Sequence, residues 1–371
     1  MVLKNLRIKN FRVFDNLEIN LHPEINIIFG LNGQGKTSVL EAIYYLSITK
    51  SFRAKNDNIV LKNNKEFFEV TGKFEDNKIF KHESRIYYSK NEGKHAFINK
   101  TKVKLFSEII GIVPLILLSL EDIELTSGVP ASRRKFLDVT LSQLYPGYLL
   151  NLQRYKKCIM QKNKLLSSEE KKNILKELEV WNKQLSVYGA KIVFLRLQFV
   201  DFLNKNIGQV YNKISGKKEK IKIEYLTAIK ESNTEISEKD IELQLKEEYK
   251  KNSDSEIKRQ TSIIGPHRDD IQFLKNDYLF RSHGSQGENK SFLLALKFLE
   301  GEYILNISGK KPLVLLDDIF GELDEHRIEN LLRIVTSQGQ SFITTTHNKR
   351  FDNIIKDKSS LFEISNNILI Q

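Results

Sequence analysis

Residues 25–38 read INIIFGLNGQGKTS and combine a short apolar stretch with a glycine-rich turn. The apolar stretch predicts a buried strand over 25–29, and TSVLEAIYYLSI predicts a helix over 37–48. Residues 30–38 fit the pattern G-x-x-x-x-G-K-[ST], whose glycines let successive backbone N–H groups curl around phosphate groups. This arrangement needs a strand before the turn and a helix N-terminus after it, so an α/β unit is expected here.

Two residues at the end of this turn have specific predicted roles. Lys36 is expected to reach the β- and γ-phosphate oxygens, and Thr37 to offer its hydroxyl to Mg²⁺. A glycine-rich turn with a chance Lys-Thr pair is the alternative, but the flanking elements favour nucleotide binding, with ATP and Mg²⁺ as cofactors. The predicted binding residues are Gly30, Leu31, Asn32, Gly33, Gln34, Gly35, Lys36, Thr37 and Ser38.

A second apolar stretch, PLVLLDD, ends in two adjacent acids, Asp317 and Asp318. It predicts a strand whose carboxyl end carries both side chains, at the edge where open α/β sheets bind ligands. Successive strand residues point to opposite faces, so the two acids have separate roles unless the chain turns there. Asp317 is the expected Mg²⁺ partner opposite Thr37, and Asp318 is expected to position the attacking water. Capping of the next helix is the alternative.

A third apolar stretch, SFITTTH, ends in His347. A lone histidine is more often structural than functional. Because this one ends a strand downstream of an acid pair, we expect it to sense or orient the γ-phosphate. Together with a helix predicted over 324–335, the two strands indicate parallel α/β organisation.

Composition favours a soluble protein with a polyanionic partner. Of 371 residues, 40% are hydrophobic and 29% charged, and no apolar run approaches the roughly 18 residues that a membrane span needs. The first residues show no signal-peptide core, so a cytoplasmic location is expected. A formal net charge of +12 favours nucleic acid as a partner, although lysine-rich solvated faces are a common alternative. The single cysteine, Cys158, cannot form an internal disulfide.

Three predicted domains follow from the pattern of the other segments. Residues 1–130 read as mostly β structure with one helix, and residues 131–262 as a mainly helical lobe without sustained heptads. Residues 263–371 return to α/β alternation. The strands expected outside the motifs are a hairpin over 6–21 and strands over 66–76, 78–89, 94–103, 112–119, 220–226 and 270–275.

The stretch SHGSQGENKSFLLALKF, residues 282–298, predicts a polar turn that opens a helix. Ser285 and Glu288 satisfy the capping-box pattern, in which each side chain bonds the other residue's backbone N–H. Capping leaves Gly284 and Gly287 without a reason. A helix N-terminus that approaches a phosphate group supplies one, because a backbone meant for close approach cannot carry bulky side chains.

These motifs, in this order, resemble the RecF family, one of the ABC-type ATPase heads of the SMC and DNA-recombination group. The resemblance rests on FGLNGQGKTSVLEAIYYLS, KSFR, SRRKFLD, GPHRDD, GSQGE, LLDDIFGELD and ITTTH, which span nearly the full length. A compact lobe separates Lys36 from Ser285, where SMC proteins carry a long coiled coil. The implied fold is mixed α/β, an ABC-type P-loop ATPase head with an antiparallel β subdomain and an inserted, mainly helical lobe.

By resemblance, two such heads dimerise face to face with ATP between them. The P-loop and acid pair of one subunit then face the turn 285–287 of the other. The acid of GELD would lie near the dimer seam, the strand-end histidine would contact the γ-phosphate, and an arginine of the N-terminal hairpin would approach the nucleotide, with a solvated strand charge as its alternative. The residues so implied are Ser285, Gln286, Gly287, Asp324, His347 and Arg12.

The chain departs from the family pattern in three places. Ser-Gln-Gly is followed by Glu288, Asn289 and Lys290, where the family commonly shows Gln-Gln-Arg. A carboxylate that pointed at a triphosphate would be unfavourable, so Glu288 is expected to fold back and cap its own helix. Gly321 stands where Ser or Ala is frequent, which should loosen that turn. No glutamine in LSLEDIELTSG marks a Q-loop, and that role stays unassigned.

The implied function is an ATP-dependent DNA-binding protein of recombinational repair and replication restart. ATP would complete a dimer that clamps duplex or gapped DNA or single-strand/duplex junctions, and slow, DNA-dependent hydrolysis would act as a conformational switch. RecR, with RecO as a further possibility, is the implied partner in loading recombinase. A P-loop kinase and a non-hydrolysing nucleotide-dependent scaffold remain as alternatives. The candidate contacts to DNA phosphates, each with a solvated face as its alternative, are Arg133, Arg134, Lys135, Lys156 and Lys157.

Overall fold

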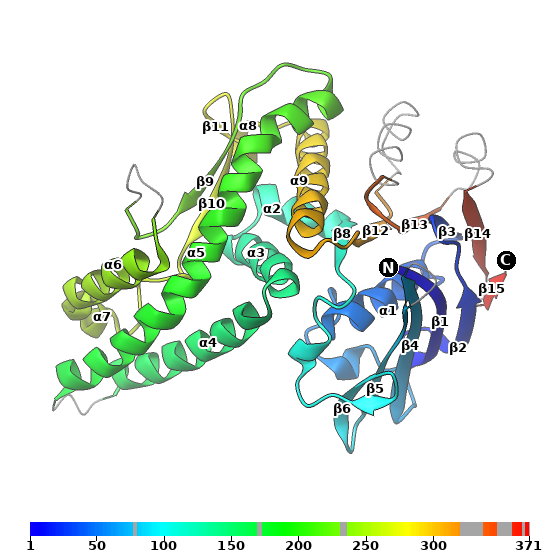
Figure 1. Ribbon diagram of the computed structural model, residues 1–371, viewed down its shortest axis with the longest axis horizontal. Helices are drawn as coiled ribbons and strands as arrows, with labels where there is room; N and C mark the ends of the chain where they lie inside the picture. Colours follow the sequence, from blue (N-terminus) through cyan, green and yellow to red (C-terminus); the bar gives the residue numbers. More distant parts are fainter. Residues whose placement is uncertain are drawn as a thin grey trace. The chain divides into compact units, whose positions relative to one another are not determined.

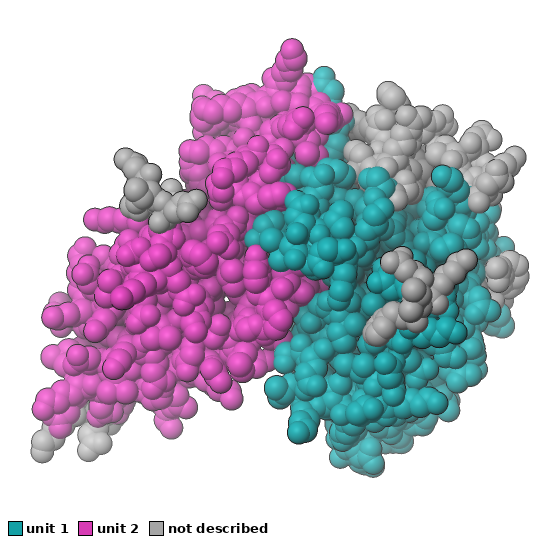
Figure 2. Space-filling view, viewed as in Figure 1, with its two compact units in different colours: residues 1–122, 214–216, 290–371 teal, residues 123–213, 217–289 magenta. Residues whose placement is uncertain are grey.

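The structure, a computed structural model, describes residues 1–76, 80–168, 173–230, 236–319, 337–346, 358–365 and 368–370. The chain forms two units, which Figure 2 colours separately. Unit 1 consists of Met1–Asp122, Ile214–Gly216 and Lys290–Gln371, and unit 2 consists of Ile123–Lys213 and Lys217–Asn289.

Unit 1 begins with an antiparallel sheet in the order β2-β1-β4-β5-β6-β7 (Figure 1). In β1, Leu6 and Ile8 are buried whereas Arg7 and Lys9 are exposed, which is the period-two pattern of a strand with one solvated face. The pairing of β1 with β2 confirms the predicted hairpin. The strands are β1 (Val2–Phe11), β2 (Phe14–Asn20), β4 (Phe67–Asp76), β5 (Phe80–Ser89), β6 (Gly93–Ile98) and β7 (Thr101–Lys102).

The second sheet of unit 1 has the order β15-β14-β3-β13-β12-β8. β15 is antiparallel to β14, and the other neighbouring pairs are parallel. The parallel pairing of β12 with β13 confirms the organisation predicted from these two apolar stretches. Apart from Asn26 in β3 and Asp317 at the end of β12, the residues of these two strands are apolar, because parallel sheets are covered on both faces. The strands are β3 (Ile25–Phe29), β8 (Leu115–Ser119), β12 (Leu313–Asp317), β13 (Ser341–Thr345), β14 (Ser359–Ser365) and β15 (Ile368–Ile370).

Helix α1 (Lys36–Ile48) packs between the two sheets. It contacts β1, β4 and β5 of the first sheet and β8, β12 and β13 of the second. Because it is covered on both sides, every residue of the helix except Thr37 is buried. Tyr45 meets Phe11 and Phe68 edge to face, with ring centroids 6.0 and 5.6 Å apart. The glycine turn before α1 therefore stands on a closely packed support.

Unit 2 is built around two long helices, α4 (Pro146–Leu166) and α5 (Ile174–Ser215) (Figure 1). Tyr148 bonds to Arg196 and Cys158 bonds to Gln184, so the helices lie side by side and antiparallel. α5 ends just before Gly216. The buried apolar side chains of α5 include Ile174, Leu178, Leu185, Ile192, Phe199 and Tyr211.

The shorter elements of unit 2 include a small antiparallel sheet in the order β11-β10-β9. A proline at the first turn begins α3, and Ser237 caps α6. The elements are α2 (Ile123–Ser127), α3 (Pro130–Leu144), β9 (Ile221–Leu226), α6 (Glu238–Lys251), α7 (Ser253–Arg259), β10 (Asp270–Lys275), β11 (Tyr278–Leu279) and α8 (Phe280–His283). Helix α9 (Gln286–Ser308) begins in unit 2 and continues in unit 1. The described part of unit 1 also has 3₁₀ turns at η1 (Asp57–Ile59), η2 (Phe106–Glu108) and η3 (Leu120–Asp122).

The unit boundaries fall at other places than the domain boundaries expected from the sequence. Unit 2 begins at residue 123, where the sequence suggests 131, and extends to 289, where the sequence suggests 262. The second difference has a clear cause, because β10 pairs with β9 and so keeps residues 270–275 with the helical unit. In the described part of the chain, every helix is too short or too polar to cross a membrane.

Candidate functional site

The turn between β3 and α1 has the backbone shape that its glycines allow. Gly30, Gly33 and Gly35 all have positive φ, at 150°, 81° and 105°. A Cβ atom on Gly30 would lie 2.4 Å from the backbone oxygen of Ile364, and one on Gly35 would lie 2.6 Å from Val13 Cγ2. Both positions therefore need glycine for conformation and for space.

The two polar residues after the turn open α1 and face the strand edge. Lys36 Nζ donates to the backbone oxygens of Gly30 and Leu31, at 2.7 and 2.9 Å, so the side chain folds back over the turn. Burial lowers the pKa of Lys36, and the nearby acid pair opposes this shift. Thr37 Oγ1 donates to Asp317 Oδ1 at 2.9 Å, so the structure brings together the two residues expected to share a metal.

The acid pair lies at the end of β12, where the chain turns. Asp317 is the last strand residue, and Asp318 has a φ of 52°. Thr344 fixes this turn: its hydroxyl donates to Asp317 Oδ1 at 2.7 Å and accepts from Asp318 N at 2.9 Å. Burial raises the pKa of Asp317, and bonds from Thr344 and Thr37 oppose the rise. Because the chain turns there, the charges of both carboxylates raise the pKa of Lys36, against the effect of burial.

A pocket of about 590 Å³ lies at the glycine turn. Of the residues predicted to bind nucleotide or Mg²⁺ here, Asn32, Gly33, residues 35–38 and Asp318 line it, whereas Gly30, Leu31, Gln34 and Asp317 are not among its lining residues. Arg12 and Val13, at the tip of the β1–β2 hairpin, also line it. Sequence reasoning missed the rest of the lining, which comes from the segment after α1. The residues of this segment that line the pocket are Arg53, Ile59, Leu61, Lys62 and Asn63. Arg53 is the last residue of the motif KSFR, for which no role was predicted.

Arg12 lies at the pocket, but it is also bound to a carboxylate that the sequence did not single out. Its Nε and Nη2 donate to the two carboxylate oxygens of Glu41, at 2.7 and 2.6 Å. The side chain of Arg12 is only 20% exposed, so it is not the solvated strand charge that was the alternative.

The turn before α9 adopts the predicted capping box. Ser285 N donates to Glu288 Oε2 at 3.0 Å, and Glu288 N donates to Ser285 Oγ at 3.3 Å. The expectation that Glu288 folds back onto its own helix is therefore confirmed. Lys275 and Lys217 bind the same carboxylate, and the bonds from Lys275 and then from the Ser285 backbone lower the pKa of Glu288 to about 2.

A local steric contact, which the sequence did not show, explains why residue 284 is glycine. A Cβ atom there would lie 2.9 Å from the backbone oxygen of Phe280 and 3.0 Å from its ring, so tight packing on α8 explains the glycine. Only Ser285, Gln286 and Gly287 then remain as residues whose backbone is expected to approach a phosphate group closely.

The turn after β8 lies in the segment LSLEDIELTSG, in which no Q-loop glutamine was found. Ser119 ends β8 opposite Asp317 of β12, and its backbone N donates to Asp122 Oδ2 at 2.7 Å. Lys297, a buried residue of α9, pairs with Asp122 at 3.3 Å and with Glu300 at 3.2 Å. Within unit 1, an acid of this turn therefore links the strand edge to α9.

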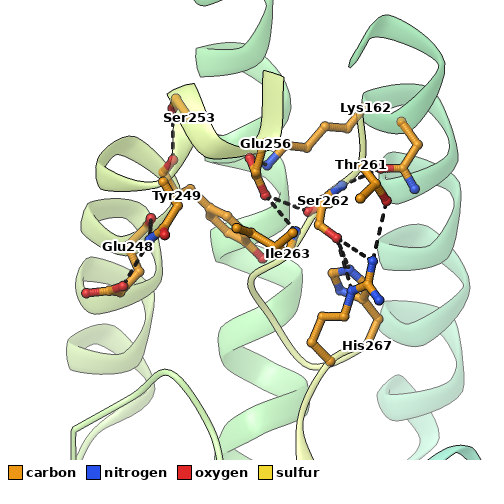
Figure 3. A network of polar contacts seen from close by, with 12 residues as sticks. Lys162, Glu248, Tyr249, Ser253, Glu256, Thr261, Ser262, Ile263 and His267 are labelled. Atoms are coloured by element: carbon orange, nitrogen blue, oxygen red, sulfur yellow. Dashed lines mark hydrogen bonds and ion pairs between the residues drawn. The ribbon is translucent and has the colours of Figure 1, made fainter. Parts of the chain in front are cut away.

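A buried polar network in unit 2 supports the loop that precedes the GPHRDD motif (Figure 3). Glu256 Oε1 accepts from Ser262 Oγ at 2.9 Å and from Ile263 N at 3.0 Å. Its other oxygen lies 2.6 Å from Lys162 Nζ, and both side chains have no exposed surface. The ring of Tyr249 lies 4.5 Å from the same ammonium. These contacts hold the loop from inside the unit.

The motif itself is bound by side chains of the unit, which corrects one expected DNA contact. Arg133 is buried and donates to both carboxylate oxygens of Asp270, at 2.7 and 2.9 Å, so the prediction that it contacts phosphate is wrong. Arg134 is partly engaged, because one of its nitrogens donates to the backbone oxygen of Asp269. The exposed members of that predicted set are Lys135, Lys156 and Lys157.

Some predicted residues lie outside the described part of the chain. These are Asp324, His347 and Gly321, together with the helix expected over 324–335. Their roles stay predictions.

The chain matches the family described as "RecF/RecN/SMC N terminal domain" over residues 2–368. The "DNA replication and repair protein RecF" of Chloroherpeton thalassium is 39% identical over 354 residues, which cover 95% of this chain and 96% of the relative. The protein of the same name from Streptococcus gordonii is 36% identical over 370 residues, 99% of each chain.

Solved structures show the same likeness. The structure described as "the recombination mediator protein RecF-ATPrS in RecFOR pathway" superposes with a TM-score of 0.90 at 32% identity, over 99% of this chain and 97% of the other. The ATP complex of the same mediator gives 0.89 at 31% identity, over 100% and 97%. An Smc head bound to the C-winged helix domain of ScpA gives 0.56 at 14% identity, over 100% and 96%, and so shows a shared fold alone.

Proposed function

The chain belongs to the RecF/RecN/SMC N terminal domain family, and on that premise we propose that it is an ATP-dependent DNA-binding protein of recombinational repair and DNA replication. The observation that carries the proposal is the meeting of the glycine turn and the acid pair, joined by the bond from Thr37 to Asp317, at one pocket. The RecF relatives support it, because their chains align with this one over nearly its whole length. That extent of the match does not favour a P-loop kinase.

The residues of the pocket suit a triphosphate with Mg²⁺. The backbone N–H groups of the turn and the N-terminus of α1 would bind phosphate oxygens, and Lys36 would exchange its two carbonyl partners for them. Thr37 and Asp317 fit a magnesium ion because their oxygens already lie 2.9 Å apart at the strand edge. Such an ion would neutralise charge that develops on the phosphates. Asp318 would position the attacking water, with His347 at the γ-phosphate.

We further propose that ATP completes a homodimer. The turn 285–287 of one subunit would meet the nucleotide held by the other, with Asp324 near the seam. The capping box would then be the resting arrangement, because the Ser285 hydroxyl cannot serve its own helix and a phosphate group fully at once. Since both subunits would bind one nucleotide, ATP binding and dimerisation must favour each other.

The dimer would clamp duplex or gapped DNA through contacts to phosphates. The net charge of +12 and the exposed side chains of Lys135, Lys156 and Lys157 support this. Slow hydrolysis would release the clamp, and RecR, with RecO, would be the partners through which it helps to load recombinase. The cytoplasm, where such DNA is repaired, is the proposed location.

Substitution Ser285→Arg tests the dimer. With ATP and Mg²⁺, we expect the wild type to reach twice the monomer mass of 43.2 kDa in solution, and the variant to bind ATP but remain a monomer. Ser237→Arg is a matched control, because Ser237 forms a second capping box in unit 2 and its loss should leave dimerisation intact. DNA affinity measured on the same samples should be higher with ATP than with ADP, and should fall by about 10³–10⁵ between 50 and 200 mM salt if roughly six to ten phosphates are contacted. A monomeric wild type, or a dimeric Ser285→Arg variant, would contradict the dimer.

Substitution Asp318→Asn separates hydrolysis from binding. Asparagine tolerates the left-handed backbone of this position as aspartate does, so the turn should persist. We expect ATP binding and dimerisation to remain, turnover to fall by about 10² or more, and DNA release to slow with it. Unchanged turnover would show that Asp318 has no hydrolytic role and would favour the non-hydrolysing scaffold.

A further inference from the structure

Glu41 is a buried carboxylate in α1, about one helical turn beyond Lys36 and Thr37. Its side chain has no exposed surface. A buried, ionised carboxylate needs partners that replace water. Arg12 supplies two of them, through Nε at 2.7 Å and Nη2 at 2.6 Å, and the hydroxyl of Ser51 supplies a third.

This pairing fixes the direction of the guanidinium of Arg12. Glu41 occupies Nε and one hydrogen of Nη2, and Nη1 donates to the backbone oxygen of Ile59 at 3.0 Å. A guanidinium carries five N–H groups, so two of them, one on each terminal nitrogen, have no partner among the described residues. Two such N–H groups can bind two phosphate oxygens side by side. Arg12 is one of the residues that line the pocket.

Ser51 extends the influence of the same carboxylate to a second arginine. While its hydroxyl donates to Glu41, its oxygen accepts from the backbone N of Arg53 at 2.9 Å and of Ala54 at 2.7 Å. Arg53 also lines the pocket. One carboxylate beneath the phosphate-binding turn thus holds the guanidinium of Arg12 and the loop backbone of Arg53.

We propose that Glu41 is a positioning residue for the recognition of nucleotide phosphates, acting through Arg12. The proposal rests on the proposed function, in which this pocket binds ATP. Since the charges of Glu41 and Arg12 largely cancel, the pair contributes direction more than net attraction. A purely structural ion pair would instead stabilise the fold and leave ATP affinity independent of the link between the two residues.

A double-mutant cycle on the full-length chain distinguishes these roles. We would measure ATP affinity by titration calorimetry with Mg²⁺ for Glu41→Gln, Arg12→Met and the double variant. Each single change should weaken ATP binding about tenfold, which corresponds to the loss of roughly one charge-assisted hydrogen bond. The double variant should bind ATP no more weakly than the single variant that has the lower affinity. Arg12→Lys should resemble Arg12→Met, because one ammonium cannot hold a carboxylate and two phosphate oxygens in that geometry.

Glu69→Gln is the matched control. Glu69 pairs with Arg85 at 3.2 Å on β4 and β5 of the same unit and does not line the pocket, so its variant should bind ATP like the wild type. Wild-type affinity in Glu41→Gln, or a tenfold loss that persists in the Arg12→Met background, would overturn the inference and leave the proposed function intact. If Glu41→Gln does not fold, undiminished ATP affinity of Arg12→Lys overturns it equally. A wild type that binds no ATP would refute the proposed function itself.

Discussion

Substitution Lys162→Met is expected to lower the unfolding free energy of unit 2 by about 3–5 kcal/mol. The change removes an ammonium that lies 2.6 Å from Glu256 and leaves that carboxylate buried without its ionic partner. Urea unfolding followed by fluorescence would measure the effect in the right unit, because the single tryptophan, Trp181, lies in α5.

Two further variants show whether the loss comes from the unpaired charge. In the Lys162→Met background, Glu256→Gln should restore part of the stability, because glutamine is neutral and still accepts the bonds from Ser262 and Ile263. Lys205→Met, which breaks the exposed pair with Asp201 on α5, should change stability by less than about 0.5 kcal/mol. Equal effects of Lys162→Met and Lys205→Met would mean that the buried pair is no more important than a surface one.

Substitution Lys36→Ala is expected to weaken ATP binding by about 100-fold or more. In the structure the ammonium already lies over the glycine turn, held by two backbone oxygens rather than by a carboxylate, so it can move to phosphate oxygens. Each charge-assisted bond contributes roughly 1.5–3 kcal/mol, which is about 10- to 150-fold in affinity. Titration calorimetry with Mg²⁺ and ATP would measure the loss.

The stability of the Lys36→Ala variant should remain close to that of the wild type. Leu31, which accepts one of the two bonds, is 75% exposed, and water can replace the ammonium there. Lys65→Ala is a suitable control, because Lys65 pairs with Asp15 outside the pocket lining and its loss should change ATP affinity by less than about twofold. An affinity for Lys36→Ala similar to that of the control would show that the glycine turn does not bind the triphosphate.

The parts of the site that could be predicted from the sequence are those whose chemistry is contained in a short segment. The glycine turn and the acid pair each combine a strand with polar residues at its end, and parallel strands bring such ends to one edge. The turn at Asp318, by contrast, depends on Thr344, which comes from the neighbouring strand β13. No local pattern marks such a partner.

The missed residues depend on contacts between distant segments. Arg12 and Glu41 are 29 residues apart, and neither the hairpin nor the helix shows that they meet. The segment 53–63, which supplies part of the pocket lining, has no regular sequence pattern that would reveal a binding surface. Arg133 shows the opposite error: an arginine in a basic helix looks exposed, but its partner Asp270 lies 137 residues away. A pattern of charges along the sequence therefore does not show which charged side chains are already paired within the fold.

The strand order of the second sheet determines when its strands can pair during synthesis on the ribosome. β3 pairs with β13 and β14, and β8 pairs with β12, so the early strands of this sheet wait for partners that are synthesised after residue 312. Unit 2 carries its own partners in residues 123–289 and can pack while they are still missing. Meanwhile the apolar edges of β3 and β8 would be open to wrong pairing, which chaperones commonly prevent. The glycine turn before α1, although it is synthesised before these partner strands, would thus be among the last features of the new protein to mature.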